Sequence, residues 1–400
     1  MFDFHARVPK QELDNRLAAL RARLTSADPD WQLVLINHKI NLYYLTGTMQ
    51  EGVLTITPDQ AILWVRRHFD RAVKESNFAD IRPMRSYRVI GEHFGQPPAT
   101  VYLESKTATL EWLGMVKKYF PIENWKSIAP YLNALRACKS DYEIDCMRAA
   151  GKLLAEVTEI VMPKLLYEGM SEAELCGAVY LELLERGSMG ICRYNQPLGE
   201  DVAGFSGFGE NTIAGLAFDG PDGCAGTCIA VQSIGSPARR LKEGDLVLMD
   251  QPSGLCGYHM DKTVVYYYGH LADDPNEALI REAYECCTQI EKWAAEQLKP
   301  GQTPENIYLQ ALEMVPEKFQ QGFMNGGKFL GHSIGLTMDE PPVLAKSFQQ
   351  PIEENMVFAI EPKIALDGIG LVGTENSYRV TANGGQSLTG SILPLTEIWE

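Results

Sequence analysis

Acidic residues in the C-terminal part of the chain occupy positions where strands normally carry apolar side chains. Asp250 ends the apolar run LVLMD, and Asp261 lies eleven residues later inside GYHMDKTVVYYYG. A strand, a turn at residues 252–254 and a returning strand would bring the two carboxylates face to face. Aspartate is depleted inside strands, and facing carboxylates repel each other in a buried hairpin. A divalent cation between them is the simplest explanation.

Three further residues have similar settings. His332 lies between glycines in FLGHSIGL, Glu361 ends the apolar run MVFAIE, and Glu375 follows at hairpin spacing in IGLVGTENSYRV. Taken singly, each has an ordinary interpretation as a turn residue, a loop residue or a strand end. A buried carboxylate without a partner costs several kcal/mol, so their joint occurrence favours a metal site. Four carboxylates and one imidazole suit Mn, Fe, Co or Zn.

The elements that must position these residues fall into two parts. An amphipathic helix over 11–25 and short apolar runs such as WQLVLI, AILWV and TVYLE predict a small α/β domain. Ser140 followed by Glu143 is a capping-box pattern that opens a long helix. We therefore expect domains over 1–139 and 140–400.

The second part contains a rough internal repeat. GMSEAEL (169–175) and GQTPENI (301–307) each begin with a turn glycine, a hydroxyl N-cap and an acidic first turn. A long helical pattern precedes each of them, over 143–162 and 276–298, and glycine-rich strands follow. This arrangement predicts a pseudo-twofold domain with a site between its halves.

The motifs GDLVLMD, GYHMDKT, GHSIGL, MVFAIEP and GTENSYRV resemble the signature blocks of the pita-bread metallopeptidases, which include methionine aminopeptidase, prolidase, aminopeptidase P and creatinase. With NLYYLTG near the start, the resemblance covers nearly the whole chain and is to the Xaa-Pro peptidase branch. It implies an α/β fold with a creatinase-like N-terminal domain and a catalytic pita-bread domain. It also implies two divalent ions, manganese first and Co, Fe or Zn as alternatives, with five ligands: Asp250, Asp261, His332, Glu361 and Glu375.

The sequence departs from the peptidase pattern at several positions. The first of two expected histidines is missing near Ser233, and Asp339 stands in place of the second. Gly373 replaces the prolidase-like arginine. Asp339 is a candidate base or a site for a cationic substrate group, and a turn cap is the alternative. His259, two residues before Asp261, is a candidate substitute donor or a packed side chain.

The resemblance implies a hydrolase of the Xaa-Pro dipeptidase or aminopeptidase type. In this reading Glu361 is the general base for a metal-activated water that attacks an amide bond. One alternative is a metal-dependent lyase or amidohydrolase acting on a small, cationic substrate. Another is a binding module of the same fold without catalysis.

Composition restricts partners and location. The net charge of −16 and the absence of a basic run argue against nucleic acid. No apolar run reaches the length of a membrane span, which argues against a membrane protein. Nine cysteines at irregular spacing favour reduced thiols in the cytoplasm. We expect a peptide or small-molecule substrate and a homodimer, in which the segment WVRRH (64–68) borders a neighbour's active site.

Overall fold

A computed structural model of the chain describes residues 6–195, 200–201, 204–216 and 220–399. These residues form two compact units, and the chain passes from the first to the second between Arg136 and Ala137. The boundary expected at Lys139 lies between α6 (Ala129–Ala137) and α7 (Asp141–Ala155). Within the described ranges, no helix is both long enough and apolar enough to span a bilayer.

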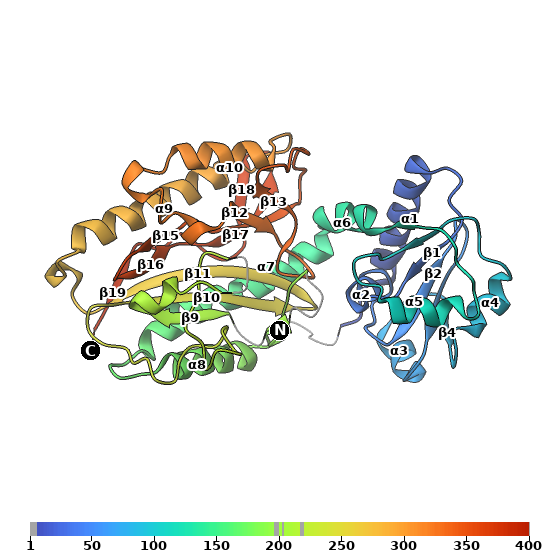
Figure 1. Cartoon of the computed structure of the whole chain (residues 1–400), viewed down its shortest axis with the longest axis horizontal. Coiled ribbons are helices and arrows are strands. Elements are labelled where there is room, and N and C mark those ends of the chain that lie inside the picture. Colours follow the sequence, from blue (N-terminus) through green and yellow to red (C-terminus); the bar gives the residue numbers. More distant parts are fainter. Residues whose placement is uncertain (1–5, 196–199, 202–203, 217–219, 400) are drawn as a thin grey trace. The chain divides into compact units, whose positions relative to one another are not determined.

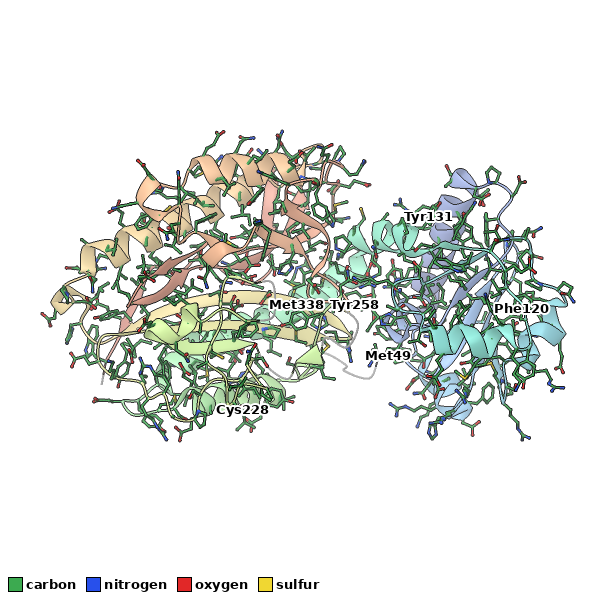
Figure 2. The ribbon with its side chains drawn as sticks, viewed as in Figure 1. Met49, Phe120, Tyr131, Cys228, Tyr258 and Met338 are labelled. Carbon is green, nitrogen blue, oxygen red and sulfur yellow. The ribbon has the colours of Figure 1, made fainter. Side chains whose placement is uncertain are left out.

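The N-terminal unit is a mixed α/β domain around one sheet, shown in blue to cyan in Figure 1. Among the described residues the sheet has six strands in the order β4-β3-β2-β1-β5-β6. The strands are β1 (Val34–Ile36), β2 (Gly52–Ile56), β3 (Ala61–Val65), β4 (Ile81–Pro83), β5 (Val101–Leu103) and β6 (Trp125–Ser127). The other helices are α1 (Lys10–Ala27), α2 (Lys39–Thr46), α3 (Phe69–Glu75), α4 (Arg88–Phe94) and α5 (Leu110–Lys117). Phe120, labelled in Figure 2, is fully buried in the core of this unit.

The C-terminal unit consists of two halves, each built from two helices and an antiparallel sheet. The first half contains α7, α8 (Glu172–Glu185), β9 (Phe205–Phe208), β10 (Asp245–Leu255) and β11 (Tyr258–Tyr268), with β19 (Thr396–Ile398) added in parallel at the edge. The second half contains α9 (Glu277–Gln297), α10 (Pro304–Glu313), β12 (Phe329–Ser333), β13 (Glu340–Ala345), β14 (Val357–Ile360), β17 (Asn376–Thr381) and β18 (Gly384–Ser387). In Figure 1 the strands lie between α9 and α10 on one side and α8 on the other, and α7 packs against β10 and β11.

Short elements complete this unit. They are the strand pairs β7 (Cys192–Arg193) with β8 (Glu200–Asp201) and β15 (Lys363–Leu366) with β16 (Gly370–Gly373), a π-helix (Glu156–Val161), and 3-10 turns at Met162–Lys164, Gly209–Ile213, Leu271–Asp273, Glu317–Phe319 and Met324–Gly326.

The expected repeat and helix starts are confirmed. Ser140 and Ser171 each form a complete capping box at the N-terminus of α7 and α8, and the hydroxyl of Thr303 caps α10. In each half a long helix packs against the strands: α7 packs on β10 and β11, and α9 packs on β18 and on the β15–β16 pair. The two sequence units therefore correspond to the two halves of the C-terminal unit.

The acidic hairpin differs from the expectation in one respect. The expected turn at residues 252–254 is wrong, because β10 continues through these residues to Leu255. The turn is instead Cys256-Gly257, and both residues have positive φ (52° and 87°), as a two-residue type I′ hairpin requires. This turn sets the register of the hairpin and hence the position of its two aspartates.

Candidate metal centre

Asp250 and Asp261 lie on the same face of the β10–β11 hairpin, but not directly opposite each other. Asp250 pairs with Thr263, and Asp261 pairs with Pro252. The two aspartates are therefore diagonal neighbours, whose Cβ atoms are about 7–8 Å apart in regular sheets. Each is 8% exposed. A diagonal pair of this kind leaves room for a cation between the two carboxylates.

The second half contributes its three residues at strand ends. His332 lies in β12, Glu361 follows β14 directly, and Glu375 lies between β16 and β17. The β15–β16 hairpin connects the two glutamates, with Lys363 paired to Gly373. Each half therefore brings its acidic residues to the point where the two sheets meet.

The two halves are joined by backbone hydrogen bonds at the site itself. The N–H of Thr263 donates to the carbonyl of Glu375, and the N–H of Glu375 donates to the carbonyl of Thr263, both at 3.3 Å. The hydroxyl of Thr263 donates to Glu375 Oε2 at 2.8 Å. Thr263 thus orients Glu375 from the other half of the domain.

One group of donors surrounds His332. Ligand atoms of Asp261, His332 and Glu375 lie within 4.8 Å of one another. His332 Nε2 also lies 3.5 Å from Glu361 Oε1. Glu375 Oε1 is buried and has no hydrogen-bond partner among the described residues. An unsatisfied buried carboxylate oxygen beside an imidazole fits a divalent cation, which accepts oxygen and nitrogen donors.

The second group of donors surrounds a lysine that the sequence reasoning missed. Lys363 Nζ lies 2.9 Å from Asp250 Oδ2, 2.9 Å from Glu361 Oε2 and 3.2 Å from Glu375 Oε2. Its side chain is fully buried. Lys363 follows Glu361 by two residues in MVFAIEPKIAL, so a strand-like reading places both on one face. A lysine inside an apolar strand was the signal that could have revealed it.

Asp222 is a further acidic residue at the site that was not expected there. Ligand atoms of Asp222, Asp250 and Glu361 lie within 4.8 Å of one another, and Asp222 Oδ1 is 3.5 Å from Lys363 Nζ. Asp222 is 4% exposed. In the sequence it lies in Gly220-Pro221-Asp222-Gly223, which is typical of a turn, so nothing in the sequence distinguished it.

Burial and the crowding of charge shift the pKa values of this cluster. Burial, together with the charges of Asp250 and Glu361, raises the pKa of Asp261 well above its usual range. Burial and the charge of Asp261 do the same to the pKa of Glu375. Burial favours a higher pKa for Asp250 as well, but the adjacent Lys363 ammonium outweighs it and holds that pKa below its usual value.

Lys363 remains charged in this setting. Burial alone lowers the pKa of a lysine, but the charges of Asp250, Glu361 and Glu375 raise the pKa of Lys363 well above its usual value. Among the described residues, the cluster thus contains one lysine and five carboxyl groups: Asp222, Asp250, Asp261, Glu361 and Glu375.

The site opens onto a cavity of about 160 Å³. Asp222, Asp250, Asp261, His332 and Glu361 line one part of it. Apolar residues line the rest, together with Asp339: Tyr194, Phe205, Pro221, Pro252, Phe329, Met338 and Val343. Met338 is labelled in Figure 2. A polar floor under an apolar wall is typical of a substrate pocket.

Asp339 faces this cavity and also supports its wall. Asp339 Oδ1 accepts a hydrogen bond from the backbone N–H of Asn195 at 2.5 Å. The neighbouring N–H of Met338 donates to the carbonyl of Arg193 at 2.7 Å. The structure therefore brings Asp339 to the candidate site, beside the five residues named from the sequence.

His259 lies elsewhere. Its side chain is fully buried and is not among the residues that line the cavity. Nε2 accepts the backbone N–H of Arg193 at 3.1 Å, and Nδ1 lies 3.1 Å from the carbonyl of Gly335. Burial lowers the pKa of His259 to about 4, so the ring is neutral. Both nitrogens bind backbone groups, which supports the interpretation as a packed side chain and not as a proton donor.

The chain is similar to known proteins in sequence and in fold. The model of metallopeptidase family M24 matches residues 145–382, and that of the creatinase/prolidase N-terminal domain matches residues 16–138. An Xaa-Pro dipeptidase from Pyrococcus horikoshii is 25% identical over 360 residues, which cover 89% of this chain and 92% of the relative. The crystal structure of the prolidase from Pyrococcus horikoshii has a TM-score of 0.78 at 22% identity and covers 95% of this chain and 99% of its own. An Xaa-Pro dipeptidase from Bacillus anthracis has a TM-score of 0.79 at 20% identity, with 96% and 99% covered.

Proposed function

This chain belongs to metallopeptidase family M24, and on that premise we propose that it is a metal-dependent peptidase that cleaves the bond before proline, as an Xaa-Pro dipeptidase does. The observation that carries the proposal is the group formed by Asp261, His332 and Glu375, of which Asp261 and His332 line the cavity and Glu375 lies buried beside them. Two buried carboxylates and an imidazole in this arrangement suit a divalent cation.

Asp261, His332, Glu361 and Glu375 would hold the cation, and Asp250 would complete the acidic wall on the side of Lys363. When bound, a divalent cation polarises the substrate carbonyl and lowers the pKa of a bound water. Among the metals that suit this donor set we propose manganese, with cobalt, iron and zinc as the alternatives to be compared.

Glu361 is placed to move the proton. Its carboxylate lines the cavity, with Oε2 bound to Lys363 and Oε1 directed toward His332. In the proposed reaction, a water oxygen attacks the amide carbon and Glu361 accepts the proton that the water loses. Glu361 then gives this proton to the proline nitrogen as the amide bond breaks.

The cavity favours a short peptide with a free amino terminus. Its volume of about 160 Å³ is below that of pockets for drug-sized ligands. Asp339 adds a carboxylate to its lining, which suits the cationic amino group of the first residue. The apolar side, with Phe329 and Val343, offers a surface for the proline ring.

The test is hydrolysis of a panel of Xaa-Pro dipeptides and Xaa-Pro tripeptides. The protein is first stripped of metal and then assayed with Mn²⁺, Co²⁺, Fe²⁺ or Zn²⁺, with free proline or the shortened peptide as the readout. We expect metal-dependent cleavage, strongest with Mn²⁺, and its loss in Glu361→Gln. Absence of cleavage of every peptide with every metal would overturn the proposal.

We also propose that the chain acts as a homodimer in the cytoplasm. The support for the location is the number of cysteines and their irregular spacing, which suit a reducing compartment. The support for the dimer is the exposed basic end of the segment 64–68. Trp64 and Val65 are buried in their own unit, so Arg66, Arg67 and His68 are the exposed part of that segment.

A further inference from the structure

The ammonium group of Lys363 is surrounded by carboxylate oxygens in the way that a bound metal cation would be. Its ammonium donates to Asp250 Oδ2, Glu361 Oε2 and Glu375 Oε2, at 2.9, 2.9 and 3.2 Å. An ammonium group has three N–H donors, so these three bonds satisfy it completely. The side chain is fully buried and contributes nothing to the lining of the cavity. Lys363 is therefore an internal part of the centre.

The fold makes room for this side chain at Gly373. The two residues are paired across the β15–β16 hairpin. A Cβ atom on Gly373 would lie 2.7 Å from Lys363 Cγ and 2.5 Å from the carbonyl oxygen of Pro362. The missing side chain at Gly373 therefore leaves the space that the buried side chain of Lys363 occupies.

Glu361 and Glu375 each direct one carboxylate oxygen toward Lys363, and their other oxygens lie on the side of His332. Oε2 of Glu361 and Oε2 of Glu375 both accept from Lys363. Oε1 of Glu361 faces His332 Nε2 at 3.5 Å, and Oε1 of Glu375 is buried with no partner within the described part of the chain. On the Lys363 side the ammonium binds both glutamates, while Asp222 Oδ2 has no hydrogen-bond partner among the described residues. On the His332 side, no lysine or arginine of the described residues pairs with either Oε1 atom.

We propose that the ammonium of Lys363 permanently takes the place of one of the two metal ions expected from the sequence, so that the protein binds a single divalent ion on the His332 side. Ions of this class bind carboxylate oxygens at about 2.0–2.2 Å. An ion bound to the three oxygens that Lys363 contacts would lie almost on its nitrogen, and two positive charges at that separation repel strongly. The inference rests on the metal site of the proposed function but not on its substrate.

The experiment measures metal stoichiometry and does not depend on activity. Metal-free wild-type protein, Lys363→Ala and Lys363→Met are titrated with Mn²⁺ by equilibrium dialysis, and bound metal is counted by mass spectrometry. Wild type binds one ion per chain and shows the electron paramagnetic resonance spectrum of an isolated Mn²⁺. Lys363→Ala removes both charge and bulk and binds two ions, with the spectrum of a spin-coupled pair. Lys363→Met keeps the bulk without the charge and binds one.

Two bound ions in wild type would overturn the role of Lys363 and leave the peptidase proposal standing. A single ion in folded Lys363→Ala would overturn it too. If Lys363→Ala fails to fold, the wild-type stoichiometry and spectrum decide the question alone. No bound metal in wild type would overturn the proposed metal-dependent function and, with it, this inference. The four outcomes separate the failure of the inference from the failure of the function.

Discussion

Asp261 destabilises the metal-free protein at high pH, and in the proposed function it is a metal ligand. Burial, together with the charges of Asp250 and Glu361, raises its pKa well above the usual range. Because the pKa is higher in the folded than in the unfolded state, the folded protein loses stability as pH rises above the unfolded value. Asp261→Asn removes this effect. At pH 8 we expect the metal-free variant to be more stable than wild type, by about 1 kcal/mol in urea unfolding.

With metal the order reverses. Asp261→Asn removes a charged ligand, and we expect the affinity for Mn²⁺ to fall at least about 100-fold, with a comparable fall in kcat/KM. Titration calorimetry and a peptidase assay measure the two effects. Metal affinity equal to that of wild type would show that Asp261 is not a ligand.

Asp339 has a charge that faces the cavity and an oxygen that holds a loop, and two substitutions separate these roles. Asp339→Asn keeps an acceptor for the Asn195 N–H but removes the charge. If the charge binds the substrate amino group, Asp339→Asn and Asp339→Ala both raise KM about tenfold for free peptides. N-acetylated peptides should then show no difference between wild type and variants. Wild-type KM in Asp339→Asn would show that the residue only anchors the loop.

The residues that sequence reasoning found and missed differ in a physical way. Asp250, Asp261, His332, Glu361 and Glu375 disturb an apolar pattern, so each was visible in the sequence. The partner of a buried charge comes from tertiary packing, which spacing does not specify. Lys363 contacts Asp250, 113 residues away in sequence, and no local pattern links them.

At the scale of elements, His259 connects β11 to the segments at Arg193 and Gly335. Burial lowers its pKa to about 4, compared with 6.5 in the unfolded chain. Between these values the unfolded chain binds a proton that the folded protein excludes. The contribution of the neutral His259 to the free energy of unfolding is therefore present above pH 6.5, and it falls by roughly 3 kcal/mol as the pH decreases to 4.

His259→Gln offers the same acceptor and donor without titrating. We expect it to flatten the pH dependence of unfolding between pH 6.5 and 4, measured by urea denaturation, while kcat at neutral pH changes by less than about threefold. A loss of kcat comparable to that of Glu361→Gln would instead support the catalytic role considered from the sequence.

The β15–β16 hairpin tolerates no side chain at Gly373. Because a Cβ there would meet the Pro362 carbonyl and Lys363 Cγ, Gly373→Ala should destabilise the protein by about 1–3 kcal/mol. Gly177→Ala in α8 is the matched control. Its Cβ meets no atom within 4 Å, and alanine in a helix interior stabilises by roughly 0.5–1 kcal/mol. Thermal unfolding compares the two, and equal effects would contradict the steric explanation.

Helix starts were easier to predict than strand ends. Ser140, Ser171 and Thr303 satisfy the first turn of their helices locally, so a few neighbouring residues determine each start. The end of β10 depends on its partner strand. Pro252 and Gly254 suggested a turn, but pairing with β11 carries the strand through them to Cys256-Gly257.

At the scale of the molecule, the sequence was enough to predict the family and the fold of both domains. The motifs of the family lie at the ends of strands, so they mark the fold as well as the site. The oligomer remains a prediction. Analytical ultracentrifugation at micromolar concentration should give a mass near twice 44.5 kDa. The exposed Arg67 and His68 are the side chains we expect at a neighbour's site, and a single-chain mass would contradict this arrangement.

The mutual backbone bonds between Thr263 and Glu375 join the halves of the C-terminal unit beside the proposed metal ligands. Asp250 and Asp261 belong to the first half, and His332, Glu361 and Glu375 to the second. Neither half holds a complete centre. A break in the chain between Tyr268 and Glu277 would leave two complementary fragments, and peptide cleavage would then report their reassociation.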